Sequence, residues 1–323
     1  MAKKNSNYLS NKESKQIVRY NVEQMRYYEK EKKRKKDPSE YTTVMKNPNN
    51  IIEIDDLVTC FFTDNGTVKS VNHVSFDLHK DKIIGVVGES GCGKSVTSLS
   101  IMQLVQAPQG QITGGSIRFN SEALGYDEAG NKLAYDIAKM PTQELYNIRG
   151  NDITMIFQEP MTSLNPVFTI GNQLDEVSFI HNKGITKEEA KVHSIDMLNQ
   201  VGISMPERVY KSYPHELSGG MRQRVMIAMA LAGNPKLIIA DEPTTALDVT
   251  IQAQILELLK KIQREKHCSI MLITHDLGVI AEMADEVVVM YAGRVIEHGT
   301  VREIFNNPCL LYTSPSPRDM RRS

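Results

Sequence analysis

The sequence of 323 residues predicts an α/β fold built around a parallel sheet. The apolar residues 82–87 are followed by a glycine-rich loop at 88–95 and by a helical pattern over 96–105. A second apolar run, residues 237–240, ends in the adjacent carboxylates Asp241 and Glu242. Strand and helix patterns that alternate in this way are typical of parallel sheets, whose functional residues gather at the carboxyl ends of the strands.

The loop GESGCGKS has the form of a phosphate-binding loop, or P-loop. Its glycines let backbone N–H groups turn towards an anion, and Lys94 adds a positive charge. Ser95 offers a hydroxyl group to Mg²⁺ at the start of the following helix. A chance glycine-rich turn is the alternative, but it would not need a strand before it and a helix after it. The residues expected to bind the nucleotide here are Gly88, Glu89, Ser90, Gly91, Cys92, Gly93, Lys94, Ser95 and Val96.

A second small-residue loop, LSGGMRQR at 217–224, precedes a predicted helix over residues 222–232. Through Ser218, Gly219 and Gly220 it would also present N–H groups and the positive end of a helix dipole to an anion. Taken alone, such a turn is more often an ordinary helix start. The chain has two anion-binding loops but only one of them carries a lysine, so we expect two chains packed head to tail, each completing the other's nucleotide site.

These motifs resemble those of ATP-binding-cassette (ABC) ATPases. ATP and Mg²⁺ are the nucleotide and metal that the resemblance implies. Asp241 is expected to hold Mg²⁺ together with Ser95, and Glu242 is expected to polarise the attacking water, a contribution of about 10²–10⁴-fold. A pair of acids that merely caps a turn after a strand is the alternative, and the P-loop argues against it.

Further positions match the family's pattern one by one. The resemblance assigns Gln158 to the metal and the attacking water, His275 to the γ-phosphate, and Asp248 to the contact with the partner subunit. Phe61 is the expected base-stacking aromatic, and Phe62 competes with it for that role. A lone histidine at a strand end or an aromatic in a strand is more often structural, so these assignments depend on the neighbouring motifs.

The resemblance implies an ABC-type nucleotide-binding domain with a RecA-like core, an antiparallel β subdomain and an inserted helical subdomain. Residues 51–62 and 71–78 form the expected antiparallel pair, residues 114–120 a further strand, and residues 121–150 a polar surface insertion. The expected organisation is a basic, flexible arm at 1–47, an ATPase domain at 48–308 with helical residues at about 165–233, and an aberrant or truncated tail at 309–323.

Charge is distributed unevenly along the chain. Residues 1–36 hold 12 of the 38 Lys and Arg residues but only 4 of the 39 Asp and Glu residues, although the whole chain has a net charge of −1. Val18, Val22 and Met25 fall at helical spacing, so part of this arm could form a weak helix. We favour a solvated tail, with contact to anionic lipid as the alternative. Nucleic-acid binding is not expected, because no aromatic-rich basic surface continues into the domain.

Other sequence features are consistent with a cytosolic protein. No apolar stretch approaches the roughly 20 residues of a membrane helix, and no signal peptide is recognisable. The four cysteines have no metal-binding spacing, so we expect reduced thiols. Some related ATPases carry iron–sulfur cysteines in a C-terminal extension. Residues 310–323 depart from the family pattern and are not expected to be native family sequence; Cys309 alone cannot hold a cluster, so no iron–sulfur cluster is assigned.

Four segments are similar to the oligopeptide and dipeptide permease ATPases, at residues 88–104, 157–176, 212–235 and 241–256. The resemblance implies an ATPase at the cytoplasmic face of the cell membrane that powers two membrane permease subunits. It also implies a second ABC ATPase, identical or related, and an extracytoplasmic solute-binding protein that selects the cargo. An importer of nickel, glutathione or another small solute is the alternative, and a soluble, non-transport ABC ATPase is the second alternative.

Overall fold

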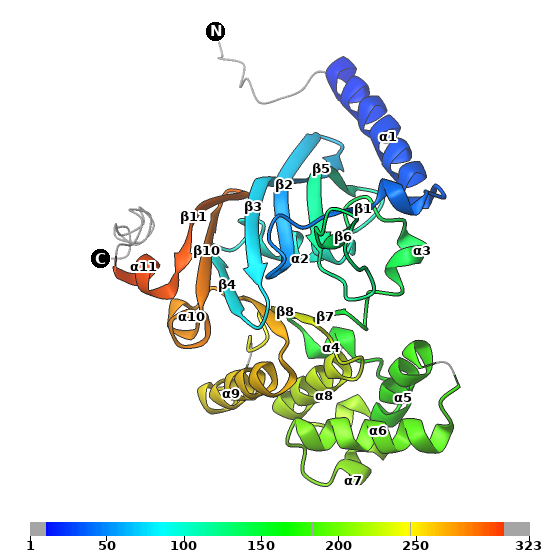
Figure 1. Ribbon diagram of the computed structural model, residues 1–323, viewed down its shortest axis with the longest axis vertical. Coiled ribbons are helices and arrows are strands. Elements are labelled where there is room, and N and C mark those ends of the chain that lie inside the picture. Colours follow the sequence, from blue (N-terminus) through cyan, green and yellow to red (C-terminus); the bar gives the residue numbers. More distant parts are fainter. Residues whose placement is uncertain (1–10, 183, 246, 307–323) are drawn as a thin grey trace.

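The computed structural model describes residues 11–182, 184–245 and 247–306, which form two β-sheets and a set of helices around them (Figure 1). The strands are β1 (Thr42–Val44), β2 (Asn50–Thr63), β3 (Gly66–His79), β4 (Ile83–Gly88), β5 (Gly110–Phe119), β6 (Leu133–Asp136), β7 (Ile153–Ile156), β8 (Leu237–Asp241), β9 (Ser269–Ile273), β10 (Glu286–Tyr291) and β11 (Arg294–Thr300). The helices are α1 (Asn11–Lys33), α2 (Lys94–Ile101), α3 (Thr142–Leu145), α4 (Pro160–Ser163), α5 (Ile170–His181), α6 (Lys187–Gln200), α7 (Pro206–Lys211), α8 (Gly219–Leu231), α9 (Val249–Lys266), α10 (Leu277–Met283) and α11 (Val301–Asn306), with short 3₁₀ helices at Pro38–Glu40 and Pro214–Glu216.

The larger sheet is the predicted parallel sheet. Its strand order is β11-β10-β4-β9-β8-β7, and only the β10–β11 pair is antiparallel. Strands β4, β8 and β9 are buried along their whole length, as expected for strands covered on both faces. The order places the carboxyl ends of β4, β8 and β9 next to one another, which brings the P-loop and the acid pair to one sheet edge.

The smaller sheet has the order β1-β6-β5-β2-β3, and its strand pairs are antiparallel. It contains the expected hairpin, with β2 and β3 joined at Thr63 and Gly66. One expectation needs correction. Residues 121–150 are not only a surface insertion, because Ile137, Leu145 and Ile148 are buried in the core shared with this sheet. These three apolar residues are spaced too widely within a polar segment for a helical or strand periodicity to indicate that they are buried.

Helices α5, α6 and α7 pack together at the end of the molecule opposite α1, in the green part of Figure 1. Helix α8 contacts both α5 and α6 and also strand β7, so it joins this helical region to the parallel sheet. Two of the helix starts are fixed by side-chain caps, Thr169 before α5 and Thr186 before α6. Such a cap satisfies a backbone N–H that the helix leaves unpaired.

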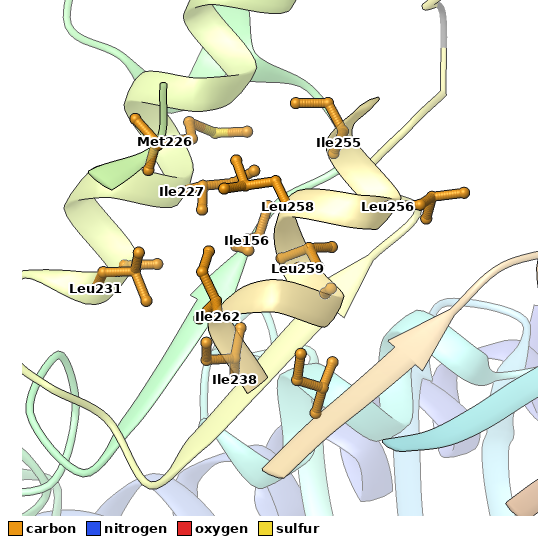
Figure 2. Close-up of a cluster of buried hydrophobic side chains, with 14 of the residues drawn as sticks. Ile156, Met226, Ile227, Leu231, Ile238, Ile255, Leu256, Leu258, Leu259 and Ile262 are labelled. Carbon is orange, nitrogen blue, oxygen red and sulfur yellow. The ribbon is translucent and has the colours of Figure 1, made fainter. Parts of the chain in front are cut away.

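A continuous apolar core connects the helices with the parallel sheet. Figure 2 shows its centre, where side chains of α8 and α9 meet strands β7 and β8. Leu259 and Ile238 are completely buried there. Helix α9 turns one apolar face towards this core, since Ile255, Leu258 and Ile262 follow one another at spacings of three and four residues.

The N-terminal arm expected at residues 1–47 contains a helix in its described part. Residues Asn11–Lys33 form α1, which packs against the smaller sheet at β2, β3 and β5. The helical spacing in the sequence indicated a helix, but charge gave no sign of the docking. Asn21, only 2% exposed, and the partly buried Tyr28 make the contacts that hold it.

Within the described ranges no helix is both long and apolar enough to cross a membrane. The expected tail at residues 309–323 and the position Ala246 beside Asp248 lie outside the described residues.

Candidate functional site

The P-loop connects β4 to α2 in a conformation that depends on glycine. Gly93 has φ of 103°, in the left-handed region, and a Cβ atom there would lie 2.4 Å from the backbone oxygen of Ser70. The loop therefore passes directly against strand β3. Behind it, the N–H of Gly293 donates to the Cys92 carbonyl at 3.0 Å, and the Gly293 carbonyl accepts from the N–H of Asn72 at 2.7 Å. The turn between β10 and β11 thus supports the loop.

Lys94 lies inside the loop and is only 5% exposed. Its Nζ donates to the carbonyl of Gly88 at 2.7 Å and to that of Glu89 at 3.0 Å. These contacts hold the ammonium group at the start of α2, where N–H groups and the helix dipole also favour an anion. The arrangement concentrates positive charge at one point of the sheet edge.

Asp241 ends strand β8 beside the P-loop. Ser95 Oγ donates to Asp241 Oδ1 at 3.1 Å, so the hydroxyl and the carboxylate are direct neighbours. Asp241 is 6% exposed, and this burial raises its pKa, while the hydrogen bond from Ser95 acts in the opposite direction. A buried carboxylate whose charge is destabilised in this way favours a cationic partner.

Glu242 follows Asp241 and has φ of 45°, in the left-handed region. Such a conformation costs a non-glycine residue on the order of 1–3 kcal/mol, and residues of this kind are enriched at functional sites. Three side chains surround its carboxylate. Gln158 Nε2 donates to Oε2 at 3.1 Å, Thr245 Oγ1 donates to the same oxygen at 2.9 Å, and His275 Nδ1 lies 3.4 Å from Oε1.

These residues surround one cavity of about 590 Å³. That volume falls within the range of small-molecule sites, roughly 300–1,000 Å³. The cavity is lined by Ser70, Ser90, Gly91, Gly93, Lys94, Ser95, Val96, Gln158, Glu242 and His275. All except Ser70 are residues that the sequence predicts for the site. Gly88, Glu89 and Cys92 belong to the same loop, and Asp241 contacts Ser95, but these four residues are not part of the lining.

The second predicted loop lies elsewhere on the chain. Ser218 caps α8 by accepting from the N–H of Met221 at 3.3 Å, and Asp248 caps α9 by accepting from the N–H of Ile251 at 3.0 Å. A Cβ atom on Gly220 would lie 2.8 Å from the Ile251 side chain, so these two helix starts pack against each other. Ser218, Gly219, Gly220 and Asp248 thus form a second group, and none of them lines the cavity with Lys94.

A phosphate-binding loop, a second glycine loop and an acid pair, in this order along the chain, agree with what the comparisons with known proteins found. Residues 71–245 match the family described as ABC transporter. The chain belongs to the ABC transporter family. It is 52% identical over 263 residues to the oligopeptide transport ATP-binding protein OppD of Bacillus subtilis (strain 168), which covers 81% of this chain and 70% of that protein. It is 50% identical to the dipeptide transport ATP-binding protein DppD of the same organism, over 81% of this chain and 74% of that one.

Solved structures agree with the family. The ATP-binding cassette MJ0796, in a dimeric post-hydrolysis state bound to ADP and Pi, superposes with a TM-score of 0.64 at 25% identity, covering 78% of this chain and 99% of that chain. The predicted fold class is therefore confirmed, and this protein is an ABC-type ATPase that binds ATP.

The structure separates the two aromatics that compete for base stacking in this ABC ATPase. Phe62 points under α1, is 5% exposed and stacks on Tyr28 with ring centroids 6.3 Å apart. It is therefore covered by protein. Phe61 is half-buried on the same strand and abuts Gly110, where a Cβ atom would lie 2.9 Å from its ring. Phe61 does not line the cavity, but its strand runs beside the Ser70 segment that does.

Sequence reasoning missed Ser70, Thr245 and Gly293. Thr245 stands three residues after Glu242, a spacing from which its hydrogen bond to the carboxylate could have been anticipated. Ser70 and Gly293 carry no signal in the sequence, because strand β3 and the turn between β10 and β11 meet the P-loop only through tertiary packing.

The residues present fit a magnesium ion. Mg²⁺ prefers oxygen ligands and is usually held by one or two carboxylates together with substrate phosphates and waters. Ser95 Oγ and Asp241 Oδ1 supply two neighbouring oxygens, and the amide of Gln158 lines the same cavity. The chemistry of this donor set suits Mg²⁺ bound together with a nucleotide rather than a metal held by protein alone.

Proposed function

We propose that this protein is the ATP-hydrolysing subunit of an importer that takes up oligopeptides or dipeptides through separate membrane subunits. Relatives about half identical to this chain carry oligopeptide or dipeptide transport in their names, which supports the cargo class. The assignment of ATP hydrolysis rests on the carboxylate of Glu242, which is held by Gln158, Thr245 and His275 at the edge of the P-loop cavity.

The proposed chemistry assigns one task to each group. P-loop N–H groups and Lys94 bind the phosphates. Glu242 accepts a proton from the attacking water while the oxygen of that water bonds to the γ-phosphorus. The bond from that phosphorus to the bridging oxygen breaks, giving ADP and phosphate. His275 lies beside Glu242 and would contact the γ-phosphate. Such catalysis consists mostly of positioning and charge stabilisation.

Ser95, Asp241 and Gln158 are the residues proposed to hold Mg²⁺. When bound, Mg²⁺ supplies positive charge that stabilises the negative charge of the phosphates. The raised pKa of Asp241, caused chiefly by its burial, favours a cation at this position, because pairing with positive charge offsets the cost of the buried carboxylate.

A head-to-tail pair of ATPase subunits explains the two separate groups of residues. Within one chain, Ser218, Gly219, Gly220 and Asp248 do not reach the cavity. We assign them to the nucleotide held by the P-loop of a second ABC ATPase, either the same chain or a related one. The dimeric state of the cassette MJ0796 supports such a pairing.

We assign the contact with the membrane subunits to an apolar cavity next to Gln158. This cavity, of about 270 Å³, lies between β7, α5 and α8 and is lined by Met155, Phe157, Ile180 and Met229 among others. Phe157 is adjacent to Gln158, so a segment seated there would respond to the state of the nucleotide. The protein would then lie at the cytoplasmic face of the membrane without crossing it, and an extracytoplasmic binding protein would select the cargo.

The first test is Mg²⁺-dependent ATP hydrolysis by the purified chain at increasing protein concentration. We expect activity that rises more steeply than linearly, and a loss of about 10²–10⁴-fold in Glu242→Gln with nucleotide binding retained. Glu128→Gln, an exposed acid in a distant loop, is the matched control and keeps wild-type activity. A fully active Glu242→Gln protein would overturn the assignment of the base.

The cargo is tested in cells that carry Glu242→Gln in place of the wild-type protein. Uptake of a labelled oligopeptide should fall to the background level, whereas uptake of nickel and of glutathione should not change. Loss of nickel or glutathione uptake with normal peptide uptake would replace the peptide assignment by that solute.

A further inference from the structure

The hairpin formed by β2 and β3 is held between two helices. On one face it carries α1, which contacts both strands. On the other face, Thr59 Oγ1 lies 2.8 Å from Ser100 Oγ of α2, the helix that begins at Lys94. Ser70 on β3 lines the nucleotide cavity, and its carbonyl faces Gly93 of the P-loop. A displacement of this hairpin would therefore change the wall of the nucleotide site.

Asn21 attaches α1 to the tip of the hairpin. Its Nδ2 donates to the carbonyl of Thr63 at 2.7 Å and to that of Gly66 at 3.3 Å, and its Oδ1 accepts from Thr67 Oγ1 at 3.1 Å. One side chain thus satisfies polar groups on both strands. Asn21 is almost fully buried in doing so, and a buried polar group that loses such partners is costly.

Apolar and polar contacts extend this attachment along the strands. Met25 and Tyr28 pack on the cluster of Cys60 and Phe62, with the Tyr28 and Phe62 rings stacked at an interplanar angle of 22°. Directly after Tyr28 in α1, Glu29 accepts a hydrogen bond of 2.8 Å from the buried Gln111 on the neighbouring strand β5. The cluster faces α1, so the intervening Phe61 is turned to the other face of β2, as alternation along a strand requires.

We propose that α1 is a clamp that positions the β2–β3 hairpin for nucleotide binding, with Asn21 as its main positioning residue. The inference rests on the proposed function, because it assumes that Phe61 and Ser70 adjoin the base and sugar end of bound ATP. The main contacts of α1 are with strands β2, β3 and β5 and with helix α3. Asn21 acts at the tip of the hairpin, on Thr63, Gly66 and Thr67, so we expect its loss to displace first the part of the hairpin near Phe61, while Lys94 and the P-loop still bind the triphosphate.

The clamp can be distinguished from a general effect on stability by comparing the binding of ATP with that of tripolyphosphate. Tripolyphosphate has the phosphate chain of ATP but no base or sugar. A change that mispositions the hairpin should weaken the binding of ATP and leave the binding of tripolyphosphate unchanged. A general loss of stability would weaken both ligands together.

The test uses the full chain with Asn21→Asp, which keeps the acceptor for Thr67 but places a carboxylate oxygen against the Thr63 and Gly66 carbonyls. We expect the dissociation constant of a non-hydrolysable ATP analogue to rise about 10-fold, since a displacement of an ångström can cost up to about 100-fold. The KM for ATP should rise with it, while kcat and tripolyphosphate affinity stay constant. Glu23→Gln, an exposed isosteric change on the same helix, is the control and should change none of them.

A second variant keeps the test decisive if Asn21→Asp does not fold. Tyr28→Leu removes the stacked ring but retains an apolar side chain, and it should give the same split between ATP and tripolyphosphate. Combining either variant with Phe61→Ala should add little further loss of ATP affinity, because both changes remove the same contact. Equal losses for the two ligands, or no loss for ATP, would overturn the clamp.

The experiments distinguish a failure of the clamp from a failure of the ATPase assignment. If the wild-type protein binds both ligands and loses turnover only in Glu242→Gln, the ATPase assignment stands whatever α1 does. If the wild-type protein binds neither ligand, the ATPase site itself fails, and the clamp is refuted with it.

Discussion

Gln158 Nε2 donates a hydrogen bond to Glu242 Oε2 at 3.1 Å, and this bond connects the end of strand β7 with the end of strand β8. The two residues are 84 positions apart in the chain. Because Phe157, next to Gln158, lines the apolar cavity assigned to the membrane subunits, the bond joins that surface to the proposed catalytic base. A displacement of Phe157 in that cavity would therefore change the position of the Glu242 carboxylate, and the reverse also holds.

Replacing Gln158 by Ala should lower kcat by roughly 10- to 100-fold, because the base loses a group that holds it in position. Binding of ATP should change much less, since Lys94 and the P-loop remain intact. Steady-state kinetics together with equilibrium nucleotide binding measure the two effects. Gln200→Ala, on helix α6, serves as control, and a variant that loses binding and turnover equally would contradict the positioning role.

Thr245→Val removes the hydroxyl that donates to Glu242 at 2.9 Å and keeps the shape of the side chain. We expect about a 10-fold lower kcat with an unchanged affinity for ATP, as one hydrogen bond to a charged group contributes roughly 1.5–3 kcal/mol. Thr245→Ser restores the hydroxyl and should restore the rate. Failure of the serine variant to recover activity would mean that the hydroxyl is not what matters.

Lys94→Ala should weaken ATP binding by about 10- to 100-fold, because charge-assisted hydrogen bonds contribute roughly 1.5–3 kcal/mol each and 1.4 kcal/mol corresponds to a factor of ten. Tripolyphosphate binding should fall by a similar factor. Isothermal titration calorimetry measures both. Lys80→Ala, an exposed lysine before β4, is the matched control, and equal affinities in wild type and Lys94→Ala would exclude the P-loop as the phosphate site.

A mixing experiment determines whether two identical chains form the ATPase pair. A Cβ atom on Gly219 meets only Leu247 at 3.7 Å, an ordinary contact, so Gly219→Asp should fold normally while repelling a phosphate. Alone, Gly219→Asp and Lys94→Ala should both be inactive. Mixed in equal amounts, they should recover about a quarter of wild-type activity, because half of the dimers contain one intact site of two. No recovery would indicate pairing with a different ATPase.

Tyr210 should stabilise the helical region at neutral pH but not in strong alkali. Its hydroxyl donates to Asp175 at 2.6 Å, and burial, followed by this hydrogen bond, raises the pKa of Tyr210 from 10.0 to about 12. Since the folded-state pKa lies above the unfolded value, the stabilisation is complete below about pH 10 and is lost as pH rises through about 12.

Tyr210→Phe should therefore lower the unfolding free energy by roughly 1.5–3 kcal/mol near neutral pH, the usual contribution of a hydrogen bond to a charged group. The difference from wild type should shrink as the pH rises above 10. Urea denaturation at several pH values measures it, with the exposed Tyr146→Phe as control. A difference independent of pH would show that the hydroxyl does not act through its proton.

Much of the site could be read from the sequence because its chemistry lies in short, contiguous segments. Lys94 and Ser95 stand in one loop, and Asp241 and Glu242 end one strand, so a parallel sheet was enough to predict that they meet. The choice between Phe61 and Phe62 could not be made in this way. Both follow the same strand pattern, and only the docking of α1 on one face of β2 covers Phe62 and turns Phe61 to the other.

The sequence by itself determined the identity and order of the phosphate loop, the second glycine loop and the acid pair, because local backbone and side-chain chemistry specify each of them. The tertiary structure alone decided which of these groups share a cavity, that Ser70 and Gly293 adjoin the P-loop, and that a basic N-terminal segment is a packed helix. Those relations depend on contacts between segments distant along the chain, and the free energy of such contacts comes from burial and hydrogen bonds that no local pattern records.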